Sequence, residues 1–460
     1  MPAPSVLVEG IQNSSGVSPP DPNGDIGATQ YVQAVNSIEG SLFSVFAKDG
    51  SLLDGPKVMS DLWADVGGGC ENKAKGDPII QYDQLAGRWL ITQFAFEIDI
   101  FGNVQGPYFE CIWISSSSDA LGDGTAYSFL IDAKFFPDFP KIGVWHDAYY
   151  ASFHLFNKRG QYAGQAFIAF DRDSMLAGAE AREIRFIFNE ADFGALPSDA
   201  VGPVPPPAGT PNYFVVVKDD NLGAKKDRII IYPYHVNWDD IEDTFVGQPT
   251  KLPTLPFNSK LCGGSFFCIK QGGTDQRLDA LGGFPGAGDD GGMFLGYPLS
   301  YRNFGDSETL VFNHSVKLSA NNRSGLRWYQ INDPGGTPAI AQQGTHAPAD
   351  SLSRWVGSTG IDGDGNLALG YSTSSKKAFP SIAYTGRLAT DPPGTMGQGE
   401  GILMPGGGPQ TGSDRWGDYT SMMVDPVDDC TFWYTNEFYP KKSKTKWHTT
   451  IAAFKFPSCQ

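Results

Sequence analysis

The chain has 460 residues and a formal net charge of −17, because 51 Asp and Glu outnumber 34 Lys and Arg. Nucleic acids and anionic membrane surfaces attract basic proteins, so this charge argues against both as partners. With 56 Gly, 33 Pro and 18% charged residues, the composition is typical of many short strands joined by turns and argues against long helices. No run of eighteen apolar residues occurs, so we expect no membrane-spanning helix.

Short apolar runs separated by Asp, Gly and Pro turns recur along the chain and predict antiparallel hairpins. The clearest hairpin spans residues 414–439, where an apolar run, the turn DPVDD and an aromatic-rich run follow one another. Weaker copies occupy 76–94, 138–153 and 354–371. Repeated small sheets predict an all-β fold, a β-propeller. Any β protein can also place Asp turns between apolar runs.

We predict a single β-propeller domain over residues 1–460. The spacing of the hairpins indicates seven blades, and six or eight are also compatible with it. The isolated strand at 6–11 would complete the last blade and close the ring, which leaves no free sheet edge. The Gly- and Pro-rich loop at 239–292 is long enough to suggest a functional role. The blades are expected near 31–53, 76–129, 140–188, 212–238, 293–333, 354–390 and 414–456.

The six cysteines allow fifteen disulfide connectivities, and proximity in the sequence favours one of them. We expect Cys70 to pair with Cys111, Cys262 with Cys268, and Cys430 with Cys459. Six buried free thiols are the alternative. Disulfides would place the protein in an oxidising compartment, and the first residues resemble a mature start without a signal peptide. We therefore expect a secreted or periplasmic protein.

Polar residues lie where the innermost strands of a propeller would begin, and such positions meet in its central funnel. They are Asp77, Asp138, Lys141, Arg302, Arg354, Asp418 and Tyr419. Carboxylates that face arginines there could bind a sugar acid or act as acid and base. Ion pairs between blades are the alternative. As substrate-binding residues we predict Arg354, Trp355, Arg415, Trp416, Asp418, Asp77 and His146.

A dense polar and aromatic cluster at 301–315 supplies the predicted catalytic residues Tyr301, Arg302 and His314. An Arg that neutralises a carboxylate, with a Tyr and a His that move a proton at the adjacent carbon, would perform the chemistry of a polysaccharide lyase. Ordinary packing inside a blade is the alternative. His154 also lies in an aromatic strand segment, where a base, a metal ligand or a structural histidine all fit.

Two segments alternate Asp or Asn with small residues, as loops that bind calcium do. The predicted metal ligands are Asp21, Asn23 and Asp25 in the first segment, and Asp362, Asp364 and Asn366 in the second. Neither segment has the glutamate that ends an EF-hand loop, and both fit plain β-turns. Calcium is thus the one candidate cofactor.

The chain resembles a group of secreted bacterial proteins with a sialidase-like gross architecture. The resemblance is carried by PPDPNGDIG (19–27), GDPIIQYDQLAGRW (76–89), YRNFGDSETLVFNHSV (301–316) and RWGDYTSMMVDPVDDCTFWYTNE (415–437). It implies a propeller and secretion but assigns no reaction. No SxDxGxTW Asp-box occurs, so no catalytic residue of a sialidase is transferred.

Together these features predict a secreted β-propeller enzyme that acts on a carbohydrate, with an acidic polysaccharide as the candidate substrate of a lyase or a glycosidase. The alternative is a non-catalytic surface module that binds a glycan or a protein, since no specific catalytic motif is present. We expect a monomer in either case.

Overall fold

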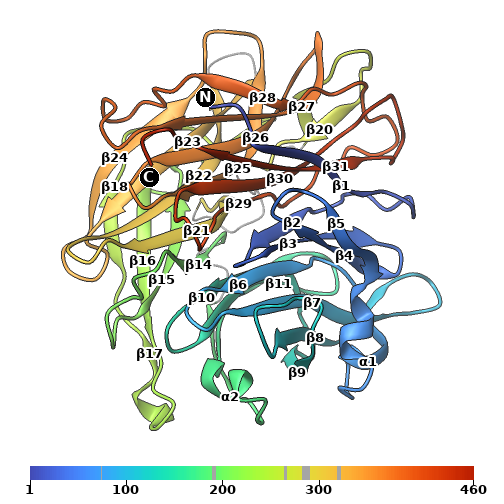
Figure 1. The fold of residues 1–460 in the computed structure, drawn as a ribbon, viewed down its shortest axis with the longest axis vertical. Helices are drawn as coiled ribbons and strands as arrows, with labels where there is room; N and C mark the ends of the chain where they lie inside the picture. The colour runs from blue at the N-terminus through green and yellow to red at the C-terminus, as the bar shows by residue number, and fades with distance from the viewer. Residues whose placement is uncertain (74, 189–192, 264–266, 282–290, 319–322, 460) are drawn as a thin grey trace.

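The computed structural model describes residues 1–459 except 74, 189–192, 264–266, 282–290 and 319–322. The regular secondary structure of the described part is almost all β-strand, which confirms the predicted all-β class (Figure 1). Two short α-helices, α1 (Cys70–Lys73) and α2 (Arg172–Leu176), lie between strands. Short 3-10 helices occupy Met59–Trp63, Asp220–Leu222 and Ile241–Asp243.

The strands form seven antiparallel units of four in the described residues, and each unit after the first follows the previous one along the chain. Unit one consists of β2 (Asn23–Ile26), β3 (Gln30–Ser37), β4 (Gly40–Ala47) and β5 (Leu52–Val58). Unit two consists of β6 (Ile79–Asp83), β7 (Arg88–Ile98), β8 (Val104–Ser115) and β9 (Gly124–Asp132). Unit three consists of β10 (Phe136–Val144), β11 (Tyr149–Phe156), β12 (Tyr162–Phe170) and β13 (Glu183–Phe188).

Units four and five share one sheet, because their first strands pair in parallel. Unit four consists of β14 (Leu196–Val201), β15 (Asn212–Lys218), β16 (Arg228–His235) and β17 (Phe245–Val246), and β18 (Thr250–Pro253) also pairs with β16. Unit five consists of β21 (Gly296–Asn303), β22 (Glu308–Leu318), β23 (Arg323–Asn332) and β24 (Ala339–His346). Between them, β19 (Phe267–Lys270) and β20 (Arg277–Asp279) form a separate hairpin.

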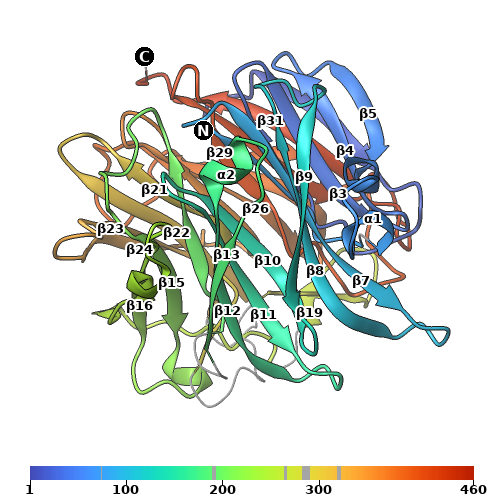
Figure 2. The same cartoon turned by 90° about the horizontal axis from the view of Figure 1, so that it is seen from below.

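Units six and seven complete the set. Unit six is β25 (Ser353–Ile361), β26 (Leu367–Ser375), β27 (Ala378–Arg387) and β28 (Glu400–Met404), and unit seven is β29 (Ser421–Val424), β30 (Thr431–Phe438), β31 (His448–Lys455) and β1 (Val6–Gln12). The N-terminal strand β1 pairs antiparallel with β31, with Val8 opposite Ile451. Both ends of the chain therefore contribute to one sheet, and the termini lie near each other in both views (Figures 1 and 2).

The first strands of the units contact one another in an unbroken circuit. β2 contacts β6, β6 contacts β10, β10 contacts β14, β14 contacts β21, β21 contacts β25, β25 contacts β29, and β29 contacts β2 (Figure 1). Side chains on these strands hydrogen-bond to the backbone of the next unit. Asn23 Oδ1 accepts from Ile80 N at 2.7 Å, and Asp25 Oδ2 accepts from Tyr82 N at 2.7 Å. Such bonds satisfy amides that would otherwise be buried without a partner.

The hairpin predicted at 414–439 is present as β29 and β30, with Met423 opposite Trp433. Its turn forms because Asp side chains accept hydrogen bonds from nearby backbone amides: Asp425 from Val427 at 2.9 Å, and Asp428 from Thr431 at 2.9 Å. The β-branched and aromatic residues of β30 are almost all buried. Trp433 stacks on Tyr31 of unit one at 5.3 Å between ring centroids, which packs the last unit against the first.

Three segments differ from the sequence prediction. Residues 23–26, taken as part of a cation loop, form the buried strand β2, and the side chains of Asn23 and Asp25 accept hydrogen bonds from β6. Residues 196–201, outside the predicted blades, form β14 between two other first strands. The predicted irregular loop at 239–292 contains the short strands β17, β18, β19 and β20. In each case the strands form by pairing with residues distant in the sequence, which the local sequence pattern does not reveal.

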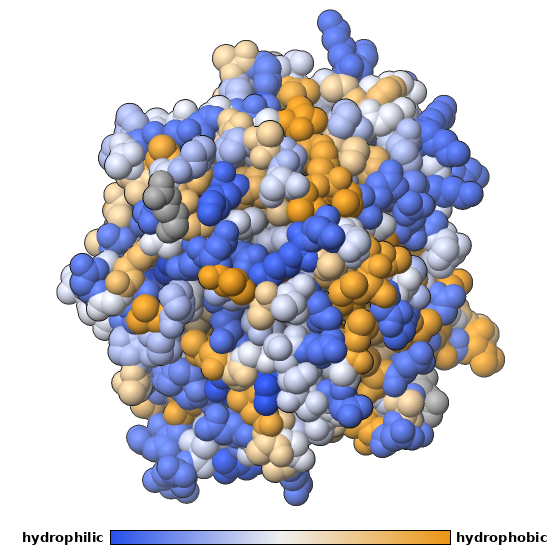
Figure 3. Space-filling model, viewed as in Figure 1, coloured by the Kyte–Doolittle hydropathy of each residue, from blue (hydrophilic) through white to orange (hydrophobic). Residues whose placement is uncertain are grey.

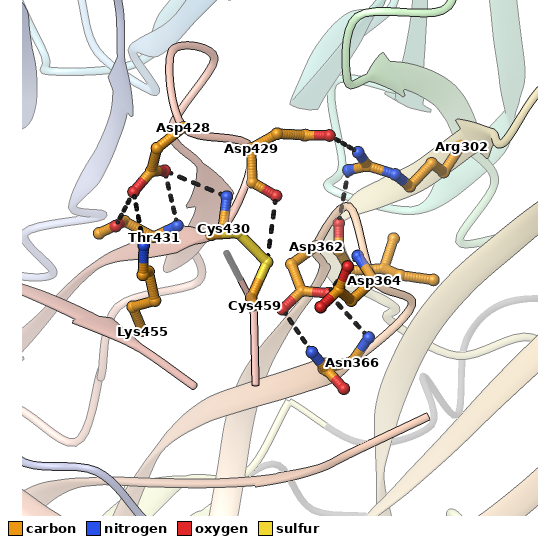
Figure 4. Close-up of a disulfide and its surroundings, with 11 residues drawn as sticks. Arg302, Asp362, Asp364, Asn366, Asp428, Asp429, Cys430, Thr431, Lys455 and Cys459 are labelled. Carbon is orange, nitrogen blue, oxygen red and sulfur yellow. Dashed lines mark hydrogen bonds and ion pairs between the residues drawn. A yellow bond between two sulfur atoms is a disulfide. The ribbon is translucent and has the colours of Figure 1, made fainter. Parts of the chain in front are cut away.

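All three predicted disulfides are confirmed: Cys70–Cys111, Cys262–Cys268 and Cys430–Cys459. Cys430–Cys459 joins the start of β30 to the end of the chain beyond β31 (Figure 4). It ties the C-terminus to the sheet that already holds β1.

The surface in Figure 3 mixes hydrophilic residues with smaller apolar areas. In the described part of the chain, every helix falls short of the length and apolar character needed to cross a bilayer.

Candidate functional site

Polar residues from four units and from the β19–β20 hairpin meet at the end of the molecule where first strands begin. Asp21 precedes β2, Asp77 precedes β6, and Asp418 precedes β29. The set, called the mouth cluster below, consists of Asp21, Asp77, Asp138, Lys141, Asp279, Arg415, Asp418 and Tyr419. The structure thus brings together five of the seven residues expected at the strand starts.

Hydrogen bonds connect these residues across unit boundaries. Asp21 Oδ1 accepts from the backbone N–H of Asp418 at 2.7 Å. The Tyr419 hydroxyl donates to Asp77 Oδ2 at 2.9 Å. Arg415 donates through Nε to Asp279 at 3.0 Å and through Nη2 to Asp418 at 2.5 Å. The first and last units and the β19–β20 hairpin are therefore held in one polar network.

Lys141 is buried at the centre of the cluster, with 1% of its surface exposed. Its Nζ lies 3.3 Å from the ring centroid of Phe139 and 3.4 Å from that of Tyr419, so two aromatic faces enclose the amine. Burial lowers the pKa of Lys141 to about 7, although the neighbouring carboxylates, Asp77 first among them, oppose this shift. This lysine can therefore gain or lose a proton near neutral pH.

The carboxyl groups of the cluster repel one another and have lost much of their hydration. Burial, followed by repulsion from Asp138, raises the pKa of Asp77 to about 7. Burial and repulsion from Asp418 raise the pKa of Asp138 to about 6. Burial also places the pKa of Asp21 well above its ordinary value. Strongly shifted groups that share a site are typical of catalytic centres.

The backbone is strained just before two first strands, β2 and β6, and inside a third, β10. Asp21, Asp77 and Phe139 have φ values of 46°, 46° and 57°, and each precedes a proline. A non-glycine residue in this left-handed region costs roughly 1–3 kcal/mol and persists only where surrounding contacts enforce it. The turns aim the side chains of Asp21 and Asp77 toward Tyr419 and Asp418, where their hydrogen bonds lie.

A cavity of about 210 Å³ opens beside the cluster. Asp138, Asp279, Arg415 and Asp418 line one part of it. The rest of the wall consists of Phe139, His154, Phe156, Phe267, Leu281 and Phe294. Carboxylates beside aromatic rings suit a ligand with both hydroxyl groups and apolar C–H faces, as a sugar has.

His154 contributes a hydrogen-bonding atom to this wall. Its ring stacks between Phe139 and Phe193, and its Nε2 accepts from Gly194 N at 3.2 Å. Burial keeps the pKa of His154 well below its ordinary value, so the imidazole is neutral and Nδ1 carries its hydrogen. Among the described residues, that buried Nδ1–H has no acceptor, and Asp418 Oδ1 likewise has no donor.

The predicted catalytic residues Tyr301, Arg302 and His314 are not brought together. Arg302 lies opposite Thr309 in the sheet, and His314 follows five residues later along β22, roughly 16 Å away at the rise of a strand. Arg302 pairs with Asp429 and donates to Ile361 O at 3.0 Å (Figure 4). His314 Nε2 lies 3.1 Å from the Tyr329 hydroxyl. Their joint catalytic role stays a prediction that this geometry does not favour.

The seven predicted substrate-binding residues lie in different parts of the structure. Asp77, Arg415 and Asp418 belong to the mouth cluster, whereas Trp355 and Trp416 are buried and pack together at 5.7 Å between centroids. The other two, Arg354 and His146, lie outside the mouth cluster.

Arg354 is fully buried beside Glu400 and Asp350, to which it donates at distances from 2.7 to 3.1 Å. His146, between β10 and β11, is half-buried beside Asp147, and its Nε2 lies 3.8 Å from that carboxylate. For both residues a substrate-binding role stays a prediction.

Five of the six predicted calcium ligands, all but Asp364, already accept hydrogen bonds that the structure records. Asp362 Oδ1 accepts from Asp364 N at 3.0 Å and Asn366 N at 2.8 Å, which closes a turn (Figure 4). Asn23 and Asp25 bond to strand β6, as described above, and Asp21 belongs to the mouth cluster. Calcium binding at either segment stays a prediction.

Asp279 was missed in the sequence because its chain segment lacks any strand-start pattern. It lies at the end of β20, and Trp416 N donates to its Oδ1 at 3.1 Å. The only sequence signal was the unusual length of the segment 239–292.

Comparison with known proteins gives structural neighbours only, since neither a family model nor a curated protein sequence matches the chain. One neighbour is the BP39L lectin from Burkholderia pseudomallei, with 10% identity, a TM-score of 0.44, and coverage of 95% of this chain and 96% of that chain. Another is a polysaccharide lyase of family PL25, an ulvan lyase, with 11% identity, a TM-score of 0.39, and coverage of 98% and 94%.

A third neighbour, the arabinanase Arb43A from Bacillus subtilis, has 10% identity, a TM-score of 0.30, and coverage of 71% and 99%. At these scores the similarity is too distant to transfer a reaction or a residue.

Proposed function

We propose that the protein is a carbohydrate-acting enzyme whose active site is the mouth cluster and its cavity. The observation that carries this proposal is the group of carboxyls with shifted pKa values beside a cavity with an aromatic wall. Aromatic rings stack on the C–H faces of sugars, and paired carboxyls are the groups that glycoside hydrolysis uses as acid and base or nucleophile.

Within this site, Asp138 is assigned as the proton donor and Asp418 as the carboxylate that activates water or attacks the sugar. Asp138 lines the cavity, and its pKa of about 6 keeps part of the population protonated near neutrality. Asp418 Oδ2 is held by Arg415, while Oδ1 has no donor among the described residues. The Tyr419 hydroxyl donates to Asp77, and repulsion from Asp138 is, after burial, a cause of the raised pKa of Asp77.

The same proposal includes the finer architecture. We infer that the seven units form a seven-bladed propeller, because their first strands contact one another in a closed circuit and β1 completes the last sheet. The three disulfides support an oxidising compartment, such as the exterior of a cell or a periplasm.

The test is a polysaccharide and oligosaccharide panel incubated with the full chain. Hydrolysis releases new reducing ends, whereas a lyase releases an unsaturated sugar that absorbs in the ultraviolet. We expect new reducing ends without ultraviolet absorbance, and loss of this activity in Asp138→Asn and Asp418→Asn.

Glu180→Gln is the matched control, because Glu180 is exposed and far from the cavity wall in the chain. Binding of glycans without any product would contradict the enzyme proposal and favour a binding module. Products that absorb in the ultraviolet would contradict the assigned hydrolytic roles.

A further inference from the structure

The charge of the mouth cluster limits what the cavity can accept. The cluster contains five carboxyl groups, Asp21, Asp77, Asp138, Asp279 and Asp418, but two cations, Lys141 and Arg415. Burial first, and then repulsion from neighbouring carboxyls, raises the pKa values of Asp77 and Asp138. A bound positive charge would relieve this repulsion, and a bound negative charge would increase it.

Both cations are already engaged by groups of the protein, and Arg415 is the one that lines the cavity. The guanidinium of Arg415 is engaged by Asp279 at 3.0 Å and by Asp418 at 2.5 Å. The amine of Lys141 is enclosed by the rings of Phe139 and Tyr419, and it donates to Pro140 O at 3.2 Å. A uronate or sulfate group in the cavity would meet three carboxyl groups, Asp138, Asp279 and Asp418, and would compete with two of them for Arg415. Lyase-type recognition of an acidic sugar does not suit this arrangement.

The polar atoms of the cavity suit a ligand that donates to carboxylates and accepts from an imidazole. Asp418 Oδ1 is buried, and no donor reaches it from the described residues. His154, 1% exposed, lines the cavity, and its buried Nδ1–H has no acceptor in the described chain. An ammonium group donates to the first atom, and a neighbouring sugar hydroxyl accepts from the second.

The spacing of the carboxylates argues against a metal ion as the positive charge. In the described ranges, the one set of three carboxylates whose oxygens approach within 4.8 Å of one another is Asp219, Asp220 and Asp227. That set lies outside the mouth cluster. A calcium ion requires several oxygens at 2.3–2.6 Å, so a more extended organic cation fits the mouth cluster better.

We infer that the cavity binds sugars with a free, protonated amine in preference to neutral and acidic sugars. This inference rests on the proposed carbohydrate site. The ammonium would lie at Asp418, with the sugar ring against the phenylalanines of the wall. The net charge of −17 would also favour the approach of a basic glycan.

The experiment compares glucosamine, N-acetylglucosamine, glucose and glucuronate as ligands of the full chain, by saturation-transfer NMR and calorimetry. Chitosan oligosaccharides and their fully acetylated counterparts extend the series to chains. We expect the amine-bearing member of each pair to bind at least about tenfold more tightly, and glucuronate to bind most weakly. Added salt should reduce the preference, since it screens the charges.

Asp418→Asn should remove most of this preference, and Asp138→Asn provides a second variant in case the first fails to fold. Glu180→Gln removes one exposed negative charge elsewhere and should keep the preference. Equal binding of the amine and its acetylated form, or stronger binding of glucuronate, would overturn the inference. Calcium binding that Asp418→Asn abolishes, without any amine preference, would also overturn it.

These outcomes are separable from those of the proposed function. Cleavage of neutral glycans without an amine preference would leave the enzyme proposal standing and remove the inference. Amine-selective binding without cleavage of any panel member would support the inference and remove the enzyme proposal.

Discussion

The mouth cluster and the network around Arg354 have similar residue types but opposite electrostatics. Arg354 is surrounded by acceptors: Glu400 and Asp350 both pair with it, and His346 and Tyr371 also bond to Glu400. Burial opposes ionisation of Glu400, yet the hydrogen bonds from His346, Arg354 and Tyr371 hold its pKa below the ordinary value. At the mouth, carboxyls outnumber cations, and burial together with their repulsion raises the pKa values of Asp77 and Asp138.

The difference separates a structural network from a candidate active site. Where each charge has an opposite partner and full hydrogen bonding, ionisation stabilises the fold. Where like charges are crowded beside a cavity, ionisation destabilises the fold and leaves atoms available to a ligand. The experiments below test this contrast, from the largest expected effect to the smallest.

The largest effect is expected for activity at the mouth. Asp138→Asn should lower kcat/KM by about 10²–10⁴-fold, because an amide cannot donate the catalytic proton. The melting temperature should stay within a few degrees or rise, since one repelling carboxyl is removed. Steady-state rates and thermal unfolding are the measurements. A variant that keeps near-normal activity would contradict the assignment of Asp138.

A substitution in the Arg354 network should lower the stability of the fold and leave activity unchanged. Glu400→Gln should lower the free energy of unfolding by about 2 kcal/mol, because charge-assisted hydrogen bonds to a fully buried guanidinium are weakened. Activity per folded molecule should be unchanged. Denaturant unfolding at neutral pH measures the loss. If Glu400→Gln instead abolishes activity and keeps full stability, Arg354 would be a substrate-binding residue as predicted from the sequence.

The pH dependence of stability should have opposite signs at the two places. The folded pKa of Asp77, about 7, lies above the unfolded value, so its contribution to stability is present at low pH and is lost as the pH rises toward and through 7. Glu400 has a lowered pKa, so its contribution is present above the unfolded value and is lost as the pH falls.

Asp77→Asn should therefore gain stability relative to the natural chain between pH 5 and pH 8, by at least about 1 kcal/mol. Glu400→Gln should show its largest deficit at the upper end of this range and a smaller one in acid. Denaturant midpoints across the pH range measure both. Parallel curves for Asp77→Asn and the natural chain would show that Asp77 titrates normally, against the contrast drawn above.

The smallest effect is expected for Tyr301→Phe. Tyr301 is buried against Trp145, at 4.6 Å between ring centroids, and the phenyl ring preserves that packing. Activity should stay within about twofold, because the hydroxyl lies outside the cavity wall of the mouth. A large fall in kcat at unchanged stability would restore the predicted Tyr301, Arg302 and His314 centre.

Local sequence patterns were sufficient for a considerable part of this account. Alternating apolar runs with Asp and Pro turns identified the hairpin of β29 and β30, and proximity identified all three disulfides. The polar residues at strand starts included Asp77, Asp138 and Asp418. These features depend on neighbouring residues, whose backbone preferences and short separations are written directly in the chain.

Tertiary structure decided which charges meet. Arg302 and Arg354 also lie near strand ends, yet they pair with Asp429 and Glu400 away from the mouth. Asp279 and His154 reach the cavity from a short hairpin and from β11, where the sequence carries no signal of a shared site. Which charged side chains come close together depends on how separate units pack. The energy of each charge depends on its burial and its distance from other charges, and no local sequence pattern encodes either.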